Sequence, residues 1–183
     1  MFRPKRKDPL LALLTRMAHN VERSGTLLYA LAESGERTPA AWRELWAVQR
    51  DGHRQLMGAL AGTLFPPLDG QDLFALSLRL GRLLHEVTGA AGSLEFSARP
   101  PAADVVQLAA RVQEALRETS RAVDCLARRE RSGVVGAARR LYRLQDGGRE
   151  GPSGGDVESA LDGIVFSCTE LVLTIQWVLM HNS

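Results

Sequence analysis

The sequence is poor in aromatic residues. They make up only 5% of the 183 residues, whereas hydrophobic residues make up 45%. Leucine and alanine dominate the apolar positions and favour helices, whereas valine, isoleucine, threonine and aromatics would lead in strands. We therefore expect an all-α protein, and the chain is long enough to bury a substantial core.

Cysteine and net charge are also low. Cys125 and Cys168 lie among apolar residues, so we expect buried free thiols in a reducing compartment. The basic start is followed by Asp8 and Pro9, which predicts no signal peptide and a cytoplasmic protein. A formal net charge of +2 gives no reason to expect a nucleic-acid partner.

The basic residues near the N-terminus form one cluster, which has two interpretations. It is either a solvated tail or a segment attracted to anionic lipid head groups at the inner membrane face. The cluster comprises Arg3, Lys5, Arg6 and Lys7. The most apolar stretch, 161–180, contains Asp162 and Glu170, and we expect it to be a buried central helix and not a membrane span.

Apolar residues recur at spacings of three, four and seven, which predicts six amphipathic helices. Thr38 and Asp69 stand where N-caps of the second and third helices are expected. The helices are expected at about 8–33, 39–64, 70–96, 102–131, 134–144 and 156–181. Their lengths and short connections predict an antiparallel up-and-down bundle in one domain (1–183), built as two tandem three-helix units, about 8–97 and 102–181.

The corner "LFPPLDGQDLFAL" (64–76) carries a family resemblance. It resembles the segment Phe-x-Thr-Pro-Phe-Asp-Arg-Glu-Asp-Ile between the second and third helices of the PhoU-like family, through Phe65, Pro67, Asp69 and Asp72. The opening helix with Ala-x-Asn (18–20), the second helix around Gly52 and the final "CTELVLTIQWVLMHNS" (168–183) are similar in order and spacing. The chain looks most like the DUF47 branch, the phosphate-transport accessory proteins encoded beside Pit-type transporters.

The resemblance also implies a metal site that this chain has lost. Carboxylates of the family's Glu-x-x-x-Asp motifs hold iron or similar cations, and oxygen-ligand sites need several converging anionic groups. Neutral or basic residues stand at the matching positions here, so we expect no metal cluster and no cofactor. These positions are Gln49 and His53, Gly81, Arg82 and His85, Val135 and Arg139, and Phe166.

Two weaker hypotheses concern the remaining polar residues. An antiparallel second and third helix would place His53 and His85 within about one turn, where they form a transition-metal pair with Asp51 or Glu86, or are partly buried histidines with hydrogen-bond partners. Four arginines form either an anion-binding surface or a solvated helix face. They are Arg79, Arg82, Arg139 and Arg140.

No catalytic constellation stands out, so we expect a protein that is not an enzyme. The resemblance implies a regulator or accessory protein of inorganic phosphate transport, acting by contact with a transporter or signalling protein. A metal-storing or metal-sensing bundle, and a structural or oligomer-forming bundle unrelated to phosphate, are the alternatives. Homo-oligomers are also compatible with the family. We expect Trp42 to be exposed at an interface, and Trp46 and Trp177 to pack in the core.

Overall fold

The computed structural model describes residues 8–64, 66, 68–97, 101–147 and 156–182. Across these residues the chain forms helices and no strands, so the predicted all-α class is confirmed. The six helices are α1 (Pro9–Ser34), α2 (Pro39–Ala61), α3 (Gly70–Glu95), α4 (Ala103–Arg128), α5 (Arg131–Asp146) and α6 (Asp156–His181).

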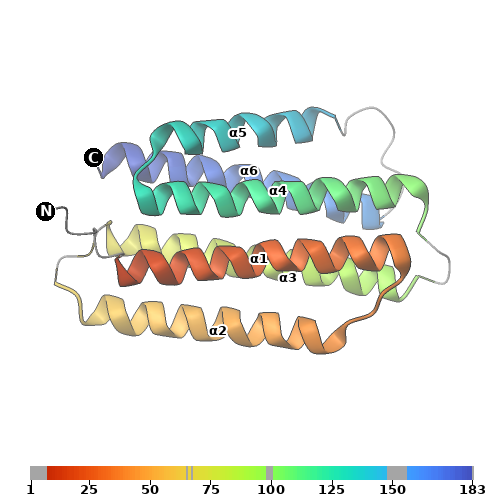
Figure 1. Cartoon of the computed structure of the whole chain (residues 1–183), viewed down its shortest axis with the longest axis horizontal. Coiled ribbons are helices and arrows are strands. Elements are labelled where there is room, and N and C mark those ends of the chain that lie inside the picture. Colours follow the sequence, from red (N-terminus) through yellow and green to blue (C-terminus); the bar gives the residue numbers. More distant parts are fainter. Residues whose placement is uncertain (1–7, 65, 67, 98–100, 148–155, 183) are drawn as a thin grey trace, which may run out of the picture.

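Four long helices surround the apolar core. Helix α1 contacts α3 and α4, and α6 contacts the same two helices, while α2 packs on α1 and α3, and α5 packs on α4 and α6. Figure 1 shows the chain running back along the bundle after each connection, with α1–α3 in its lower half and α4–α6 in its upper half. The division into two repeated units stays a prediction.

Asp69 begins α3 as predicted, because its carboxylate accepts a hydrogen bond from the Gln71 N–H at 2.7 Å. Asn182, just beyond α6, is tied to the same corner. Its side-chain oxygen accepts from the Asp69 N–H (3.3 Å), and its Nδ2 donates to Asp72 (3.1 Å). Phe65 and Pro67 lie outside the described residues, as does the basic cluster of Arg3, Lys5, Arg6 and Lys7.

Helix α2 begins at Pro39 as expected, where the missing N–H of proline costs no hydrogen bond, but the Thr38 side chain makes no capping hydrogen bond and the helix ends at Ala61 instead of about 64. Helix α4 ends at Arg128, three residues early, because Arg129 adopts a left-handed conformation with φ of 59°. A glycine serves the same purpose after α1, where Gly35 has φ of 70° and costs no Cβ strain.

Helix α6 is less enclosed than its composition predicts. It is long and apolar enough to span a membrane, a test that a core helix of a soluble protein also passes, and half of its most apolar window is buried in the bundle. One side carries large exposed apolar residues, and the expectation of a core position for Trp177 is wrong, since it is 50% exposed. Trp42, expected to be exposed, is partly buried against the core, as is Trp46.

Candidate functional site

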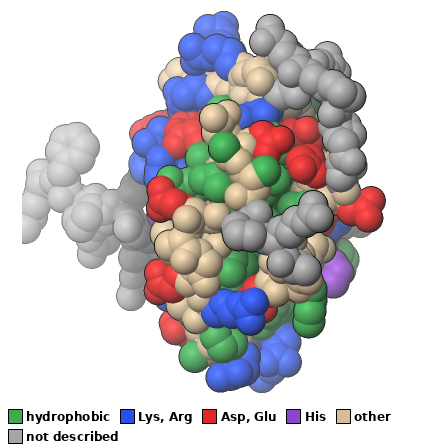
Figure 2. All heavy atoms as spheres, turned by 90° about the vertical axis from the view of Figure 1, so that its right-hand side faces the viewer, with side chains coloured by type: hydrophobic (Ala, Val, Ile, Leu, Met, Phe, Trp, Pro, Cys, Tyr) green, Lys and Arg blue, Asp and Glu red, His purple; other side chains and the backbone are tan. Residues whose placement is uncertain are grey.

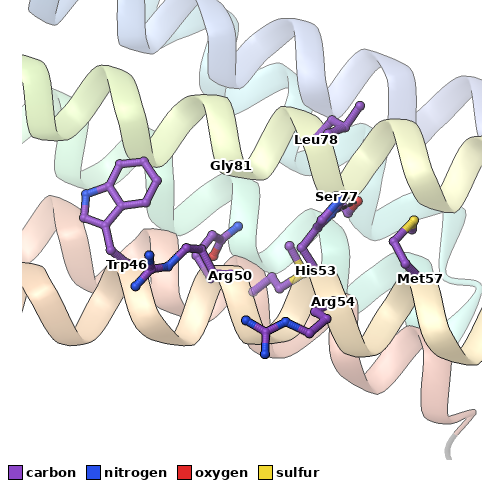
Figure 3. A pocket seen from close by; sticks show the side chains of 10 residues that line it. Trp46, Arg50, His53, Arg54, Met57, Ser77, Leu78 and Gly81 are labelled. Atoms are coloured by element: carbon purple, nitrogen blue, oxygen red, sulfur yellow. Dashed lines mark hydrogen bonds between the residues drawn. The ribbon is translucent and has the colours of Figure 1, made fainter.

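A groove opens between α2 and α3, with a volume of about 560 Å³ (Figure 3). We call it the α2–α3 groove. It exists because α2 packs mainly on α1, and because Gly81 brings no side chain to the α3 wall. The lining residues are Met17, Trp46, Gln49, Arg50, His53, Arg54, Met57, Ser77, Leu78 and Gly81.

Three positions singled out by the family pattern meet in this groove, namely Gln49, His53 and Gly81. Gln49 and His53 lie on one face of α2, four residues apart, and Gly81 lies across from them on α3. The side chains are an amide, an imidazole and a hydrogen, so the described groove offers none of the carboxylates that the family uses for cations.

The amide of Gln49 is held from α1. Asn20 Nδ2 donates to the Leu45 carbonyl at 2.8 Å and to Gln49 Oε1 at 3.2 Å. Because Oε1 accepts this bond, the Nε2 group is the other end of the amide, and it has no hydrogen-bond partner in the described part of the chain. Gln49 is only 3% exposed, so a buried donor is left unpaired beside the groove.

His53 contacts α3 through Ser77, with Nδ1 3.1 Å from the hydroxyl oxygen. The Ser77 hydroxyl donates its proton to the Phe74 carbonyl at 2.8 Å. With that proton committed, His53 Nδ1 pairs with the hydroxyl oxygen as the donor. His53 is therefore a partly buried histidine with a hydrogen-bond partner.

The prediction that His53 and His85 lie at one level is wrong. His53 is level with Ser77, whereas the His85 ring meets the edge of Trp46 at a centroid distance of 6.2 Å. Trp46 and His53 are seven residues apart on α2, which separates the two histidines by about 10 Å along the helix. The register of α2 on α3 causes this offset. Among the described residues, no group of three or more His, Cys, Asp or Glu side chains has metal-binding geometry.

The corresponding positions of the second half do not meet in the same way. Phe166 lines a different groove, between α5 and α6, together with Tyr142. Arg139 is exposed on α5, and Val135 is partly buried there. The α5–α6 groove also contains Asp146 and Asp162, so its charge is mixed.

A buried carboxylate on α4 was not anticipated. Glu118 is fully buried, with Arg121 Nη1 2.6 Å from Oε1 and Arg140 Nε 2.7 Å from Oε2. The spacing of Ala115, Glu118 and Ala122 places this acid on the inward stripe of α4, and that spacing was the available signal. Buried charges of this kind are paired because the unpaired ion is costly to desolvate.

The pairing of Glu118 corrects the hypothesis of a four-arginine anion surface. Arg140 is engaged at the α4–α5 contact, whereas Arg79 and Arg82 line a groove between α3 and α6, where Glu170 also lies. Helices α3 and α5 share no contact within the described structure. The four arginines therefore do not converge on one site.

A serine, a histidine and an aspartate line up between α1 and α4. Ser120 Oγ lies 3.3 Å from His19 Nδ1, and Asp124 Oδ1 lies 3.4 Å from His19 Nε2. This order resembles a hydrolase triad, and sequence analysis did not pair these residues. Ser120 is only 2% exposed, so a substrate carbonyl has no access to its hydroxyl. The three side chains serve as a polar contact between the two helices.

Both cysteines are buried and free, as expected. Burial raises the pKa of the Cys168 thiol to about 12, partly offset by a hydrogen bond with Thr119. Burial likewise raises the pKa of Cys125, against the opposing effect of Arg128. Both thiols stay protonated at neutral pH and are poor nucleophiles.

Exposed apolar residues gather on the neighbouring helices α3 and α6, which contact each other. We call this surface the α3–α6 face. On α6 its members are spaced by seven, four and three residues, so they share one side of the helix. They are Phe166, Leu173, Trp177 and Met180, together with Phe74 and Leu78 on α3. At its margins, Phe166 also lines the α5–α6 groove, Leu78 also lines the α2–α3 groove, and the ring of Phe74 lies 6.0 Å from that of His53.

One end of the bundle has a surface whose composition differs from that of the α3–α6 face. Figure 2 shows the end that lies at the right of Figure 1, where basic and acidic side chains are interspersed around apolar ones.

No protein-family model matches the sequence, and a search of curated proteins finds no match. The resemblance to the PhoU-like family therefore remains an expectation from motif order and spacing.

Proposed function

We propose that the protein is a non-enzymatic accessory or regulator of inorganic phosphate transport that acts by protein–protein contact. The observation that carries the contact role is the α3–α6 face, where six large apolar side chains on two adjacent helices are exposed. Exposed apolar surface of this kind marks interaction sites in soluble proteins. The link to phosphate transport comes from the motif resemblance.

The spacing on α6 suits docking of another helix. Leu173, Trp177 and Met180 repeat at four and three residues, as in a seam between packed helices. Trp177 also stacks on His181, with ring centroids 4.1 Å apart, which orders a large aromatic surface at the end of the seam. A Pit-type transporter that docks here in one of its conformations is biased toward that conformation.

The polar groups of the bundle support a role without catalysis. The Ser120–His19–Asp124 alignment has a buried serine, and both thiols have raised pKa values. We place the protein in the cytoplasm, with its N-terminal basic cluster at the membrane face, and treat the chain as two three-helix repeats in one domain.

The test compares binding by wild type and a face variant. We expect wild-type protein to recover a Pit-type phosphate transporter from the detergent-solubilised membranes of the native host. The double variant Leu173→Ser/Trp177→Ser should lose at least 90% of this recovery, because it removes the apolar seam. Phe96→Ser is the matched control, since Phe96 is an exposed large apolar residue outside the face. Helicity of all three proteins is checked by circular dichroism.

Two results would contradict the proposal. One is equal recovery of the transporter by wild type and the double variant. The other is no transporter in phosphate-rich or phosphate-poor cells. Self-association that the double variant abolishes, without any transporter, would favour the structural alternative.

A further inference from the structure

We propose that the α2–α3 groove binds an amphipathic organic anion, with a carboxylate head held between Arg50 and Arg54 and an apolar body along the groove. This inference does not depend on the proposed function. It rests on the charge of the groove, on its unpaired buried donor and on its apolar walls.

Charge distinguishes this groove from the others. Arg50 and Arg54 are its charged lining residues, and none of its described lining residues is acidic. A further groove between α1 and α4, whose lining includes Arg16 and Asp124, and the α3–α6 and α5–α6 grooves each combine arginine with at least one acidic residue. Two like charges on one rim attract an anion and repel a metal cation.

The two arginines are available to a ligand. Arg50 makes no ion pair with any described residue, and Arg54 is 3.7 Å from Asp51 in a solvent-exposed pair. An exposed pair of this kind is weak, so it competes poorly with a ligand carboxylate. Guanidinium groups also match the planar geometry of a carboxylate.

The second observation that supports the proposal is the unpaired amide group of Gln49. Its Nε2 group is buried beside the groove and lacks a partner among the described atoms, while its Oε1 is held by Asn20. The N–H end of an amide dipole is positive, so this group favours an anion in the groove over a cation. Arg50 and Arg54 are four residues apart on α2 and share one side of the helix, so one carboxylate can lie between them.

Apart from His53 and Ser77, the remaining lining is apolar and leaves space for a chain or ring. Figure 3 shows Trp46, His53 and Met57 extending from α2 toward α3, with Gly81 on the facing helix. A Cβ atom placed on Gly81 would meet no heavy atom within 4 Å outside its own stretch of α3. The volume of about 560 Å³ falls within the range of small-molecule sites.

The experiment uses octanoate as the probe, with octan-1-ol and acetate as comparisons. Octanol retains the tail without the charge, and acetate retains the head without the tail. We expect isothermal titration calorimetry to detect octanoate binding to the wild-type chain, at least tenfold weaker binding of octanol, and no acetate binding. Arg50→Gln should weaken octanoate binding severalfold and reduce its dependence on salt.

A blocking variant and its matched control complete the test. Gly81→Leu fills the groove, and Gly89→Leu adds the same side chain elsewhere on α3, again with no atom within 4 Å. Both replace a helical glycine by a better helix former, so both should fold. We expect Gly81→Leu to weaken octanoate binding at least tenfold and Gly89→Leu to leave it unchanged. Equal binding by both variants, equal binding of octanol and octanoate, or no binding by wild type would overturn the proposal.

Discussion

The two outer helices are attached to the bundle by different polar chemistry. Between α1 and α2 the buried contact is neutral, with the Asn20 amide donating to Leu45 and Gln49, while the Arg23–Glu44 ion pair lies at the exposed surface. Between α4 and α5 the contact is ionic, with the buried carboxylate of Glu118 beside Arg140. Both contacts lie in the same structural place, where an outer helix meets a long core helix.

The α1–α2 and α4–α5 contacts differ in how their buried polar groups are paired. The neutral contact leaves an amide donor unpaired next to an open groove, which is suited to a ligand. The ionic contact places both carboxylate oxygens of Glu118 within ion-pair distance of arginine nitrogens, which is suited to stability, although Oε2 and Arg140 Nε lack hydrogen-bond geometry. Among the described residues, the buried titratable side chains also lie in the second half. They are Glu118, Cys125 and Cys168.

The largest effect is expected from breaking the ionic contact. Arg140→Met keeps an apolar stem but leaves Glu118 fully buried with Arg121 alone, so we expect the free energy of unfolding to fall by about 2 kcal/mol. This is below the usual loss for a broken buried pair because Arg140 is 42% exposed. Urea unfolding at pH 7 measures the change.

Two further variants make that measurement specific. Arg139→Met, at the exposed neighbouring position, should change stability by less than about 0.5 kcal/mol. The double variant Glu118→Leu/Arg140→Met removes both charges and should recover most of the loss. If Arg139→Met and Arg140→Met lowered the free energy of unfolding equally, the Glu118–Arg140 ion pair would not account for the loss. The proposed difference between the two outer-helix contacts would then be contradicted.

The next effect is the pH dependence that Cys168 brings to the second half. Its pKa rises from 9.0 to about 12 on folding, so below pH 9 the thiol is protonated in both states and its contribution is constant. Above pH 9 the unfolded state loses the proton first, and stability falls as pH rises toward 12. Between pH 8 and pH 10 we expect this thiol to cost about 1.4 kcal/mol.

Urea unfolding of wild type and Cys168→Ala at both pH values isolates this contribution. Between pH 8 and pH 10, the free energy of unfolding of Cys168→Ala should fall by about 1.4 kcal/mol less than that of the wild type. This difference does not depend on the absolute stability of the variant. Tyr29, whose pKa is raised by the Glu33 carboxylate, titrates alike in both proteins. Parallel losses in the two proteins would mean that the Cys168 thiol is not buried as described.

The smallest effect is expected in the neutral contact. Gln49→Met removes one hydrogen bond from Asn20 but also removes the unpaired Nε2 donor, and these opposing changes should leave stability within about 0.5 kcal/mol. The same urea titration as for Arg140→Met measures it. A loss of more than about 2 kcal/mol would show that Nε2 has a partner in the free protein, and the contrast between the halves would disappear.

Sequence periodicity predicted where the helices lie better than it predicted which side of each helix is buried. The stripes on α1 and α3 identified most of their buried leucines because each helix has a distinct polar side, but they missed Leu11 and Leu94. Helix α6 is apolar over most of its circumference, so its pattern does not select the side that packs, and Trp177 was misplaced. The early end of α4 was missed because it depends on a left-handed arginine, where a glycine would have been a signal.

The candidate site was only partly predictable. Positions four residues apart on a helix share a face, so Gln49 and His53 were expected together and do line one groove. The offset of His53 from His85, and the pairing of Glu118 with Arg140, depend on how one helix is shifted along another. That shift is determined by side chains from distant segments that interlock in the core.

The amino-acid sequence alone determined that six amphipathic helices form and where Asp69 starts α3, because periodicity and capping act between residues a few positions apart. Only the tertiary structure decided which side of α6 remains exposed, which histidine meets which partner, and that an unpaired amide borders an open groove. Those features arise from packing between helices distant in the chain, where the interlocking of many side chains selects a single register.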